Sequence, residues 1–406
     1  MATRKLLDGN AAAAEAMRLA RVQVISAYPI TPQSPIAEKL ADFVAEGSLK
    51  AKYVRVESEH TAMSVAIGAQ LTGVRACTAT SSVGLALMHE VLGVASGCRL
   101  PIVMAVVNRS LASPWSLWCD HQDSMAERDS GWLQFYAEDP QEVLDYLLIA
   151  YRVAEDPRVL LPAMVCMDGF FVSHTPAVVL VPEQETVDSF LPPYNPANLY
   201  LDPDDPMFVN DLTPPSDYTE MRYQHKVAFE EAFKVITEVQ EEFFRLFGRR
   251  YSFIETYKCD DADVVLVTLG SMSGTAKYVV NELRAKGYKV GVLKIVVFRP
   301  FPAEQIRNAL KHVPVFGVMD RSAGLGAEGG PVWIEVSRAL SGIKVMPKVA
   351  GYVGGLGGRD LAPHVIEKAF RNLIDIKEGK IEMHRGSKWI DVREDAMKIR
   401  EVKVNV

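Results

Sequence analysis

The sequence predicts an α/β fold made of two units, each built around a mostly parallel β-sheet. Up to about residue 175, apolar strand-like runs alternate with segments whose apolar residues recur at helical spacing, and this alternation starts again near Ala262. Such alternation is typical of a parallel sheet with helices on both faces. Eight prolines between Pro182 and Pro215 separate the two units. A chain of 406 residues has room for two or three domains with large cores.

The elements of the first unit follow from apolar periodicity. In chain order we expect a helix over 11–20, a strand over 22–27, a helix after Thr31, an extended segment over 54–59, a helix over 61–71, a strand over 76–80, a helix over 84–94, and buried strands over 101–108 and 159–167. Thr31 is the expected N-cap of the helix that follows it, with Pro32 as the first helical residue. A hydroxyl and backbone donors would then lie at the carboxyl end of a strand, where ligands of open α/β sheets bind. The plainer interpretation is a well-capped helix.

The later elements are predicted in the same way. Residues 176–217 are rich in proline, which favours an extended strap over the surface, and a long amphipathic helix follows over 219–247. The second unit is expected to contain strands over 264–268, 290–297 and 315–319, and helices over 275–285, 303–310 and 361–373. The predicted domains are residues 1–250 and 251–373, followed by a charged tail over 374–406 that docks on a neighbouring surface.

Composition excludes several classes of protein. The chain has 44 basic and 51 acidic residues and a net charge of −7, so it shows no basic footprint for nucleic acid. No apolar run is long enough to span a membrane, and the N-terminus does not resemble a signal peptide, which predicts a soluble, cytoplasmic protein. The five cysteines form no C-x-x-C pair, so any iron–sulfur clusters of a redox system would lie in other chains.

Two charged residues are placed where chemistry could occur. Glu59 is expected at the end of a strand, where partial desolvation would let its carboxylate share a proton with a ring nitrogen. A solvated or helix-capping glutamate is the alternative. Arg109 follows a buried apolar strand, and a guanidinium there suits the capture of a small carboxylate. A structural salt bridge is the alternative for Arg109.

Three further motifs have weaker functional interpretations. The run 120–123 (Asp-His-Gln-Asp) could pass for a metal cluster, but contiguous residues rarely converge on one ion, so we expect a hydrogen-bonded loop and no metal site. The run 168–170 (Asp-Gly-Phe), with Ser173 and His174, lacks the nucleophile elbow of a serine hydrolase. The glycine-rich run 324–329 fits a dinucleotide fingerprint only formally, and tight turns or a subunit contact are the favoured interpretations.

Taken together, these segments resemble the α subunit of the 2-oxoacid:ferredoxin oxidoreductases, most closely the pyruvate:ferredoxin oxidoreductases. The matching motifs, which extend over roughly residues 8–373, are Tyr28-Pro29-Ile30-Thr31-Pro32, Glu57-Ser58-Glu59, Asn108-Arg109, Asp120-His121-Gln122-Asp123, Asp168-Gly169-Phe170 with Ser173-His174, Phe298-Arg299-Pro300-Phe301-Pro302 and the glycine-rich loop 354–360. The resemblance implies a doubly wound domain of the pyrimidine type that binds thiamine diphosphate, followed by an α/β domain like the transketolase C-terminal domain.

The resemblance also implies half of a shared cofactor site. The family's other half carries a Gly-Asp-Gly run that binds Mg²⁺ and diphosphate, and this chain has no such run. A β subunit would therefore supply Mg²⁺, diphosphate contacts and a [4Fe-4S] cluster, and γ and δ subunits would carry further clusters. The expected reaction converts pyruvate and CoA to acetyl-CoA and CO₂ and passes electrons to ferredoxin.

The site residues implied by the resemblance are Glu59, Thr31, Arg109, Tyr28 and Pro29. Glu59 would bond the aminopyrimidine ring nitrogen, Thr31 and Arg109 would hold the substrate carboxylate and keto oxygen, and Tyr28 and Pro29 would shape the cofactor wall. If Trp115 lines the pocket, it favours a small 2-oxo acid such as pyruvate. Another small 2-oxo acid or oxalate, a non-catalytic scaffold, and a dinucleotide-binding enzyme are the alternatives.

Overall fold

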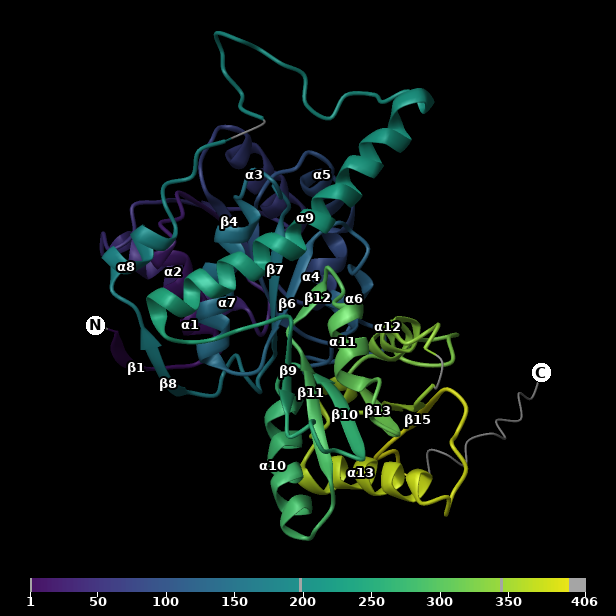
Figure 1. Ribbon diagram of the computed structural model, residues 1–406. Coiled ribbons are helices and arrows are strands. Elements are labelled where there is room, and N and C mark those ends of the chain that lie inside the picture. The colour runs from purple at the N-terminus through teal and green to yellow at the C-terminus, as the bar shows by residue number, and fades with distance from the viewer. Residues whose placement is uncertain (1, 197–198, 344–345, 394–406) are drawn as a thin grey trace, which may run out of the picture. The chain divides into compact units, whose positions relative to one another are not determined.

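The computed structural model describes residues 2–196, 199–343 and 346–393 (Figure 1). The chain divides into two compact units. The first contains residues 1–255 and the short segments 269–271 and 294–302, and the second contains the remainder. Among the described helices, none combines the length and apolar character that a membrane crossing requires.

The first unit is built on a seven-stranded sheet whose strand order is β12-β6-β7-β5-β4-β2-β3. The strands are β2 (Val24–Ala27), β3 (Lys52–Arg55), β4 (Ala76–Thr80), β5 (Val103–Asn108), β6 (Leu133–Ala137), β7 (Ala163–Asp168) and β12 (Val297–Arg299). Neighbouring strands are parallel except β12, which runs antiparallel to β6. The direction in which the sheet grows reverses between β2 and β4, and ligands of open α/β sheets bind at such a switch point.

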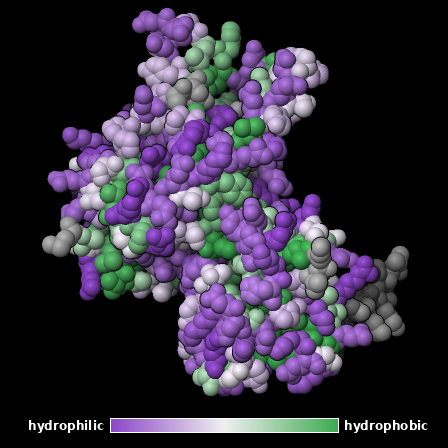
Figure 2. All heavy atoms as spheres, in the orientation of Figure 1, coloured by the Kyte–Doolittle hydropathy of each residue, from purple (hydrophilic) through white to green (hydrophobic). Residues whose placement is uncertain are grey.

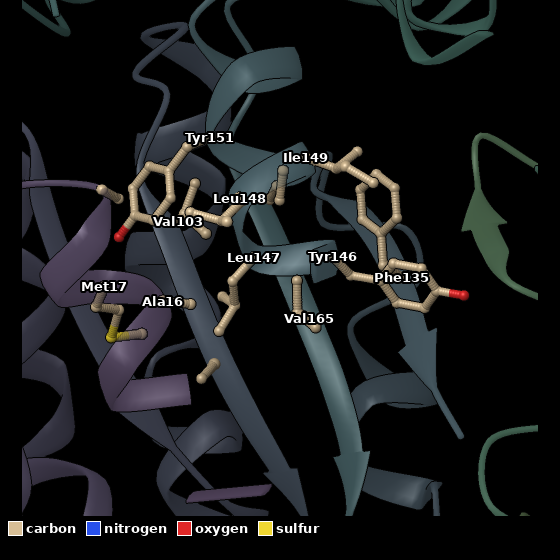
Figure 3. Packing of buried hydrophobic residues seen from close by; sticks show 14 of the residues in the cluster. Ala16, Met17, Val103, Phe135, Tyr146, Leu147, Leu148, Ile149, Tyr151 and Val165 are labelled. Atoms are coloured by element: carbon tan, nitrogen blue, oxygen red, sulfur yellow. The ribbon is translucent and has the colours of Figure 1, made fainter. Parts of the chain in front are cut away.

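Helices cover this sheet. They are α1 (Gly9–Leu19), α2 (Ser34–Ala45), α3 (Glu59–Leu71), α4 (Ser82–Leu87), α5 (His89–Gly97), α6 (Gln122–Ala126), α7 (Pro140–Ala154), α8 (Gln184–Phe190) and α9 (Pro215–Phe247). Figure 3 shows Leu147 and Leu148 of α7 packed among Val103 of β5, Val165 of β7 and Ala16 of α1, all fully buried. Because α7 is buried along almost its whole length, it is the central helix of this core.

The predicted N-cap at Thr31 is wrong. Helix α2 begins at Ser34, and its N-cap is Gln33, whose side chain makes no capping hydrogen bond. The backbone N–H of Gln33 donates to the carbonyl of Ile30 at 2.8 Å, which closes a turn before the helix. The proline in the first helical turn is Pro35 and not Pro32. Two prolines three residues apart both satisfy the capping rules, so the sequence did not distinguish them.

The predicted extended segment over 54–59 is also wrong at its end. Strand β3 stops at Arg55, and Glu59 is the first residue of α3. The cap of this helix is Ser58, whose hydroxyl accepts a hydrogen bond from the backbone N–H of Thr61 at 3.2 Å. Glu57 therefore does not share a strand face with Glu59, and its side chain is exposed. A strong N-cap overrides the extended propensity of the preceding valines.

The predicted strap over 176–217 contains regular structure in its first part. Its first part forms β8 (Ala177–Val181), which pairs antiparallel with β1 (Thr3–Leu7), and helix α8. The remainder leads into α9, which begins at Pro215 and ends at Phe247, close to the predicted long helix. The sequence analysis assigned no elements between residues 109 and 158, where β6 and α7 lie.

The second unit contains a six-stranded sheet with strand order β15-β14-β13-β10-β11-β9. Its elements are β9 (Ile254–Tyr257), β10 (Val264–Leu269), α10 (Met272–Ala285), β11 (Val290–Ile295), α11 (Ala303–Leu310), β13 (Val315–Asp320), α12 (Pro331–Ala339), β14 (Lys348–Val353), the short 3₁₀ helix η1 (Leu356–Gly358), α13 (Pro363–Lys377) and β15 (Ser387–Trp389). The predicted strand over 290–297 is in fact two strands, since β11 belongs to this sheet and β12 to the first one. In the predicted tail, β15 pairs with β14, and residues 394–406 lie outside the described residues.

Candidate active site

The carboxyl ends of β2, β4 and β5 place the candidate residues along one edge of the first sheet. Thr31 follows β2, Thr80 is the last residue of β4, and Arg109 follows β5. Glu59 comes after β3 at the start of α3. These strands flank the switch point of the sheet, so residues far apart in sequence are gathered where an α/β fold binds its ligand.

Glu59 is buried, with 6% of its surface exposed. Within the described part of the chain, no hydrogen bond or ion pair engages its carboxylate. Gly84 lies beside it: a Cβ atom added there would lie 2.6 Å from Glu59 Oε1 and 2.6 Å from Thr80 Oγ1. The two oxygens therefore face the same small space. Thr80 Oγ1 is itself buried without a hydrogen-bond partner among the described residues.

Arg109 makes backbone contacts in place of the salt bridge that was its alternative interpretation. Its Nη1 donates to the carbonyl of Thr31 at 2.9 Å, and its Nε donates to the carbonyl of Ser116 at 2.9 Å. Burial lowers the pKa of the guanidinium, and the nearby charge of Asp123 opposes this shift. Since a guanidinium has five N–H groups, three remain for an anionic ligand.

Asp123 organises the backbone around these residues. Its Oδ2 accepts the backbone N–H groups of Ser82 at 2.9 Å and Arg109 at 3.0 Å, and its Oδ1 accepts from Asn108 Nδ2 at 2.8 Å. Ser82 has a positive φ of 52°, a conformation that this contact helps to hold. Burial raises the pKa of Asp123 to about 6, against the opposing effect of these donors. Asp123 thus ties the end of β4 to the end of β5.

The segment 28–31 presents its side chains outward. Thr31 and Pro29 are exposed and Tyr28 is half-buried. Thr31 is joined to Arg109 only through its backbone carbonyl, so its hydroxyl is available to a ligand. Trp115 is 73% exposed, and its effect on substrate size stays a prediction.

The run 120–123 lies in a hydrogen-bonded loop. His121 Nε2 and Asp168 Oδ1 are 2.6 Å apart, and both residues are buried. Asp168 Oδ2 also accepts from the backbone N–H of Ser271 at 3.2 Å. Donor atoms of Cys119, His121 and Asp168 lie within 4.8 Å of one another, but the pairing of His121 with Asp168 already satisfies both. Asp120 and Asp123 do not join this group.

Ser173 is part of a turn. Its hydroxyl accepts a hydrogen bond from the backbone N–H of Phe170 at 2.8 Å and lies 2.7 Å from His174 Nδ1. The side chain of Ser173 is fully buried. A nucleophile needs an exposed hydroxyl, so this pair does not form a hydrolase site.

The glycine-rich run 324–329 precedes α12, whose N-terminus is already occupied. The buried carboxylate of Asp320 accepts the backbone N–H groups of Val332 at 2.8 Å and Trp333 at 3.0 Å. A dinucleotide fingerprint requires these donors for a pyrophosphate. The oxygens of Asp320 already accept from these donors, so the geometry disfavours the dinucleotide-binding alternative.

The structure therefore brings together Thr31 with Arg109, and Glu59 with Thr80. The sequence analysis missed Thr80, Gly84 and the organising role of Asp123. A small hydroxyl residue at the end of a buried strand gave a weak signal for Thr80. No sequence pattern signalled Gly84, because its importance lies in a distance to a residue 25 positions earlier in the chain.

Comparisons with known proteins show the family to which this chain belongs. Residues 15–241 match a family model described as the thiamine-diphosphate-binding domain of pyruvate flavodoxin/ferredoxin oxidoreductase, and residues 262–366 match core domain II of pyruvate:ferredoxin oxidoreductase. The chain is 48% identical to the pyruvate synthase subunit PorA of Methanothermobacter thermautotrophicus, over 97% of this chain and 99% of that protein. It is also 48% identical to the ketoisovalerate oxidoreductase subunit VorA of Pyrococcus horikoshii, over 93% of this chain and 96% of that protein.

Two solved structures share the fold. A 2-oxoglutarate:ferredoxin oxidoreductase from Magnetococcus marinus, solved with 2-oxoglutarate, coenzyme A and succinyl-CoA bound, superposes with a TM-score of 0.70 at 20% identity. The match covers 91% of this chain and 65% of that longer chain. A split-gene transketolase in an inactive β4 tetramer superposes with a TM-score of 0.57 at 13% identity, over 91% of this chain and 99% of that chain. At these identities the likeness concerns the fold alone.

Proposed function

Because the chain belongs to the pyruvate flavodoxin/ferredoxin oxidoreductase family, we propose that it is the α subunit of a pyruvate:ferredoxin oxidoreductase. The reaction would convert pyruvate and CoA to acetyl-CoA and CO₂, with ferredoxin as the electron acceptor, and would be reversible. The observation that carries this proposal is the buried carboxylate of Glu59, which has no partner in the described chain and lies at the switch point of a thiamine-diphosphate-binding domain.

The residues present fit the aminopyrimidine half of the cofactor. A buried carboxylate without a partner is costly, and a ring nitrogen that shares its proton would remove that cost. The buried hydroxyl of Thr80, which also lacks a partner in the described chain, adds a second polar atom facing the same space. When bound, thiamine diphosphate supplies the electron sink on which a 2-oxo acid can lose CO₂.

The roles of the chain's own residues follow from their positions. Glu59, which is largely buried, would share a proton with the aminopyrimidine ring nitrogen. Arg109 would offer its remaining N–H groups to the substrate carboxylate, and the exposed hydroxyl of Thr31 would bind beside it. Tyr28 and Pro29 would form the adjoining wall.

The proposal requires partner chains. The chain has no Gly-Asp-Gly run for Mg²⁺ and diphosphate and no C-x-x-C pair for an iron–sulfur cluster. We propose that a β subunit binds Mg²⁺, the diphosphate and a [4Fe-4S] cluster, and that γ and δ subunits carry further clusters to ferredoxin. The apolar side chains that this chain exposes between residues 199 and 223 support burial against another chain.

Substitution of Glu59 by Gln tests the role of its carboxylate. We expect Glu59→Gln to assemble normally and to lower turnover by about 10²-fold or more, because the amide cannot exchange the proton. Glu57→Gln is the matched control, since Glu57 is an exposed glutamate two residues away. It should keep full turnover. Equal activity of both variants would favour the non-catalytic scaffold.

The substrate is tested by comparing kcat/KM for pyruvate, 2-oxobutyrate, 3-methyl-2-oxobutanoate, 2-oxoglutarate and oxalate in the assembled enzyme. We expect a preference for pyruvate, because the identity to pyruvate synthase subunits extends over nearly the full length of both proteins. The branched acid is the critical competitor, since VorA subunits are similarly related to this chain. A preference for any other acid would overturn the assignment to pyruvate while leaving the family unchanged.

A further inference from the structure

We propose that Gly84 is a positioning residue for Glu59, and that its missing side chain leaves the space in which the Glu59 carboxylate lies. This inference rests on the proposed function, because it assigns Gly84 importance through the role of Glu59. Gly84 is the third residue of α4, on the segment that follows β4.

The distances leave no room for a methyl group. A Cβ atom at Gly84 would lie 2.6 Å from Glu59 Oε1, 2.9 Å from Glu59 Cδ and 2.6 Å from Thr80 Oγ1. Contacts below 3.0 Å essentially never occur for real Cβ atoms. Any side chain at this position would therefore displace the carboxylate or the hydroxyl.

Backbone conformation does not explain the glycine. Gly84 is not among the glycines with positive φ, so alanine could adopt its backbone angles. Alanine in a helix is ordinarily more stabilising than glycine. Gly68 on α3 and Gly93 on α5 have no atom within 4 Å of an added Cβ, so they lack the constraint found at Gly84.

The backbone at Gly84 is also poorly able to retreat. The N–H of Ser82 donates to Asp123 Oδ2 at 2.9 Å, and the hydroxyl of Ser82 is hydrogen-bonded to the carbonyl of Ser110. The N–H of Gly84 donates to the carbonyl of Ser81 at 2.9 Å. With the start of α4 held in this way, the groups that can move are the side chains of Glu59 and Thr80. Gly84→Ala would then turn the carboxylate away from the cofactor.

The first test compares glycine substitutions in the assembled enzyme. We expect Gly84→Ala to lower kcat by about 10²-fold, as loss of general acid–base catalysis does, and to raise the thiamine diphosphate concentration needed for half-saturation. Gly68→Ala and Gly93→Ala are the matched controls and should leave both quantities within twofold of the wild type. Wild-type activity and cofactor affinity in Gly84→Ala would overturn the proposal.

A double-mutant cycle separates positioning from a general distortion. Glu59→Asp shortens the side chain by one methylene and so draws its carboxylate back from the methyl group that alanine would add at position 84. We expect Gly84→Ala to cost at most twofold in kcat in the Glu59→Asp background, against about 10²-fold in the wild type. An equal loss in both backgrounds would show that the methyl acts on something other than Glu59, and would contradict the proposal.

Folding provides a readout that does not depend on catalysis. If Gly84→Ala fails to fold, the same contact predicts that Gly84→Ala/Glu59→Ala folds, and a double variant that stays unfolded would overturn the proposal. The test also distinguishes this inference from the proposed function. Full turnover of Glu59→Gln would refute the role of Glu59, whereas an inactive Glu59→Gln beside a fully active Gly84→Ala would refute only the role of Gly84.

Discussion

At the scale of single residues, three buried carboxylates of this chain lie in different environments. Glu59 has no partner in the described chain, Asp123 accepts several backbone N–H groups, and Asp320 fills a helix N-terminus. The sequence could point to Glu59 because a carboxylate expected at the end of a strand of an α/β sheet lies where such sheets bind ligands. It pointed only weakly to Thr80 and not at all to Gly84, since both matter through their proximity to Glu59, which only the folded chain creates.

Asp320 makes a prediction about pH. Burial raises its pKa from the usual 3.8 to about 7. The folded chain then keeps a proton that the unfolded chain releases, so this group's contribution to the free energy of unfolding should fall as pH rises from about 4 to about 7. Urea unfolding of the wild type and of Asp320→Asn at pH 5, 6 and 7 measures the free energy of unfolding of each protein.

The difference in free energy of unfolding between the two proteins reports on the Asp320 carboxyl group, because Asn does not titrate. Wild-type stability should decline relative to Asp320→Asn across this range, by up to a few kcal/mol. A wild type that gains stability relative to the variant as pH rises would contradict the prediction. It would mean that the two backbone N–H donors outweigh burial and hold the pKa of Asp320 below its usual value.

At the scale of elements, helix starts were harder to predict than helices. The long helix α9 was found from its periodicity to within a few residues, whereas α2 and α3 begin elsewhere than predicted. Periodicity is repeated over many residues, but a start depends on which of several nearby capping groups meets a free N–H. Ser58 makes that contact and Thr31 does not.

Residues 199–223, which we call the arm, expose large apolar side chains to solvent. Phe208 and Leu212 are 92% and 93% exposed. The arm contains six acidic residues between Tyr200 and Glu220 and no basic residue in that range. Figure 2 shows apolar residues beside hydrophilic ones at the upper end of the view, where Figure 1 places the strap and the first turns of α9. A partner with apolar pockets and a basic rim would complement the arm.

Charge insertion tests the role of the arm. We expect Phe208→Asp/Leu212→Asp to weaken assembly with the partner subunits at least tenfold, because two exposed anchors would be lost. The melting temperature of the isolated chain should stay within about 2 °C, since surface substitutions rarely affect stability. Leu6→Asp, at a residue 71% exposed outside the arm, is the control and should assemble normally. Unchanged assembly of the double variant would exclude the arm as an interface.

At the scale of the whole molecule, alternation of strands and helices predicted both α/β units. It did not predict the strand order, because the same parallel strands can be arranged in several spatial orders that all bury the same apolar runs. Strand β12 shows this best: the single apolar run 290–297 supplies one strand to each of the two sheets. No periodicity marks the point where a run leaves one sheet for another.

The proposed function depends on a contact between Glu59 and thiamine diphosphate, in a site that we propose is shared with another chain. The most direct measurement is a structure of the assembled complex with thiamine diphosphate bound. We expect a Glu59 carboxylate oxygen at about 2.6–3.2 Å from the aminopyrimidine ring nitrogen, with Mg²⁺ and diphosphate bound by another chain. A cofactor bound elsewhere, with Glu59 far from its rings, would contradict the account.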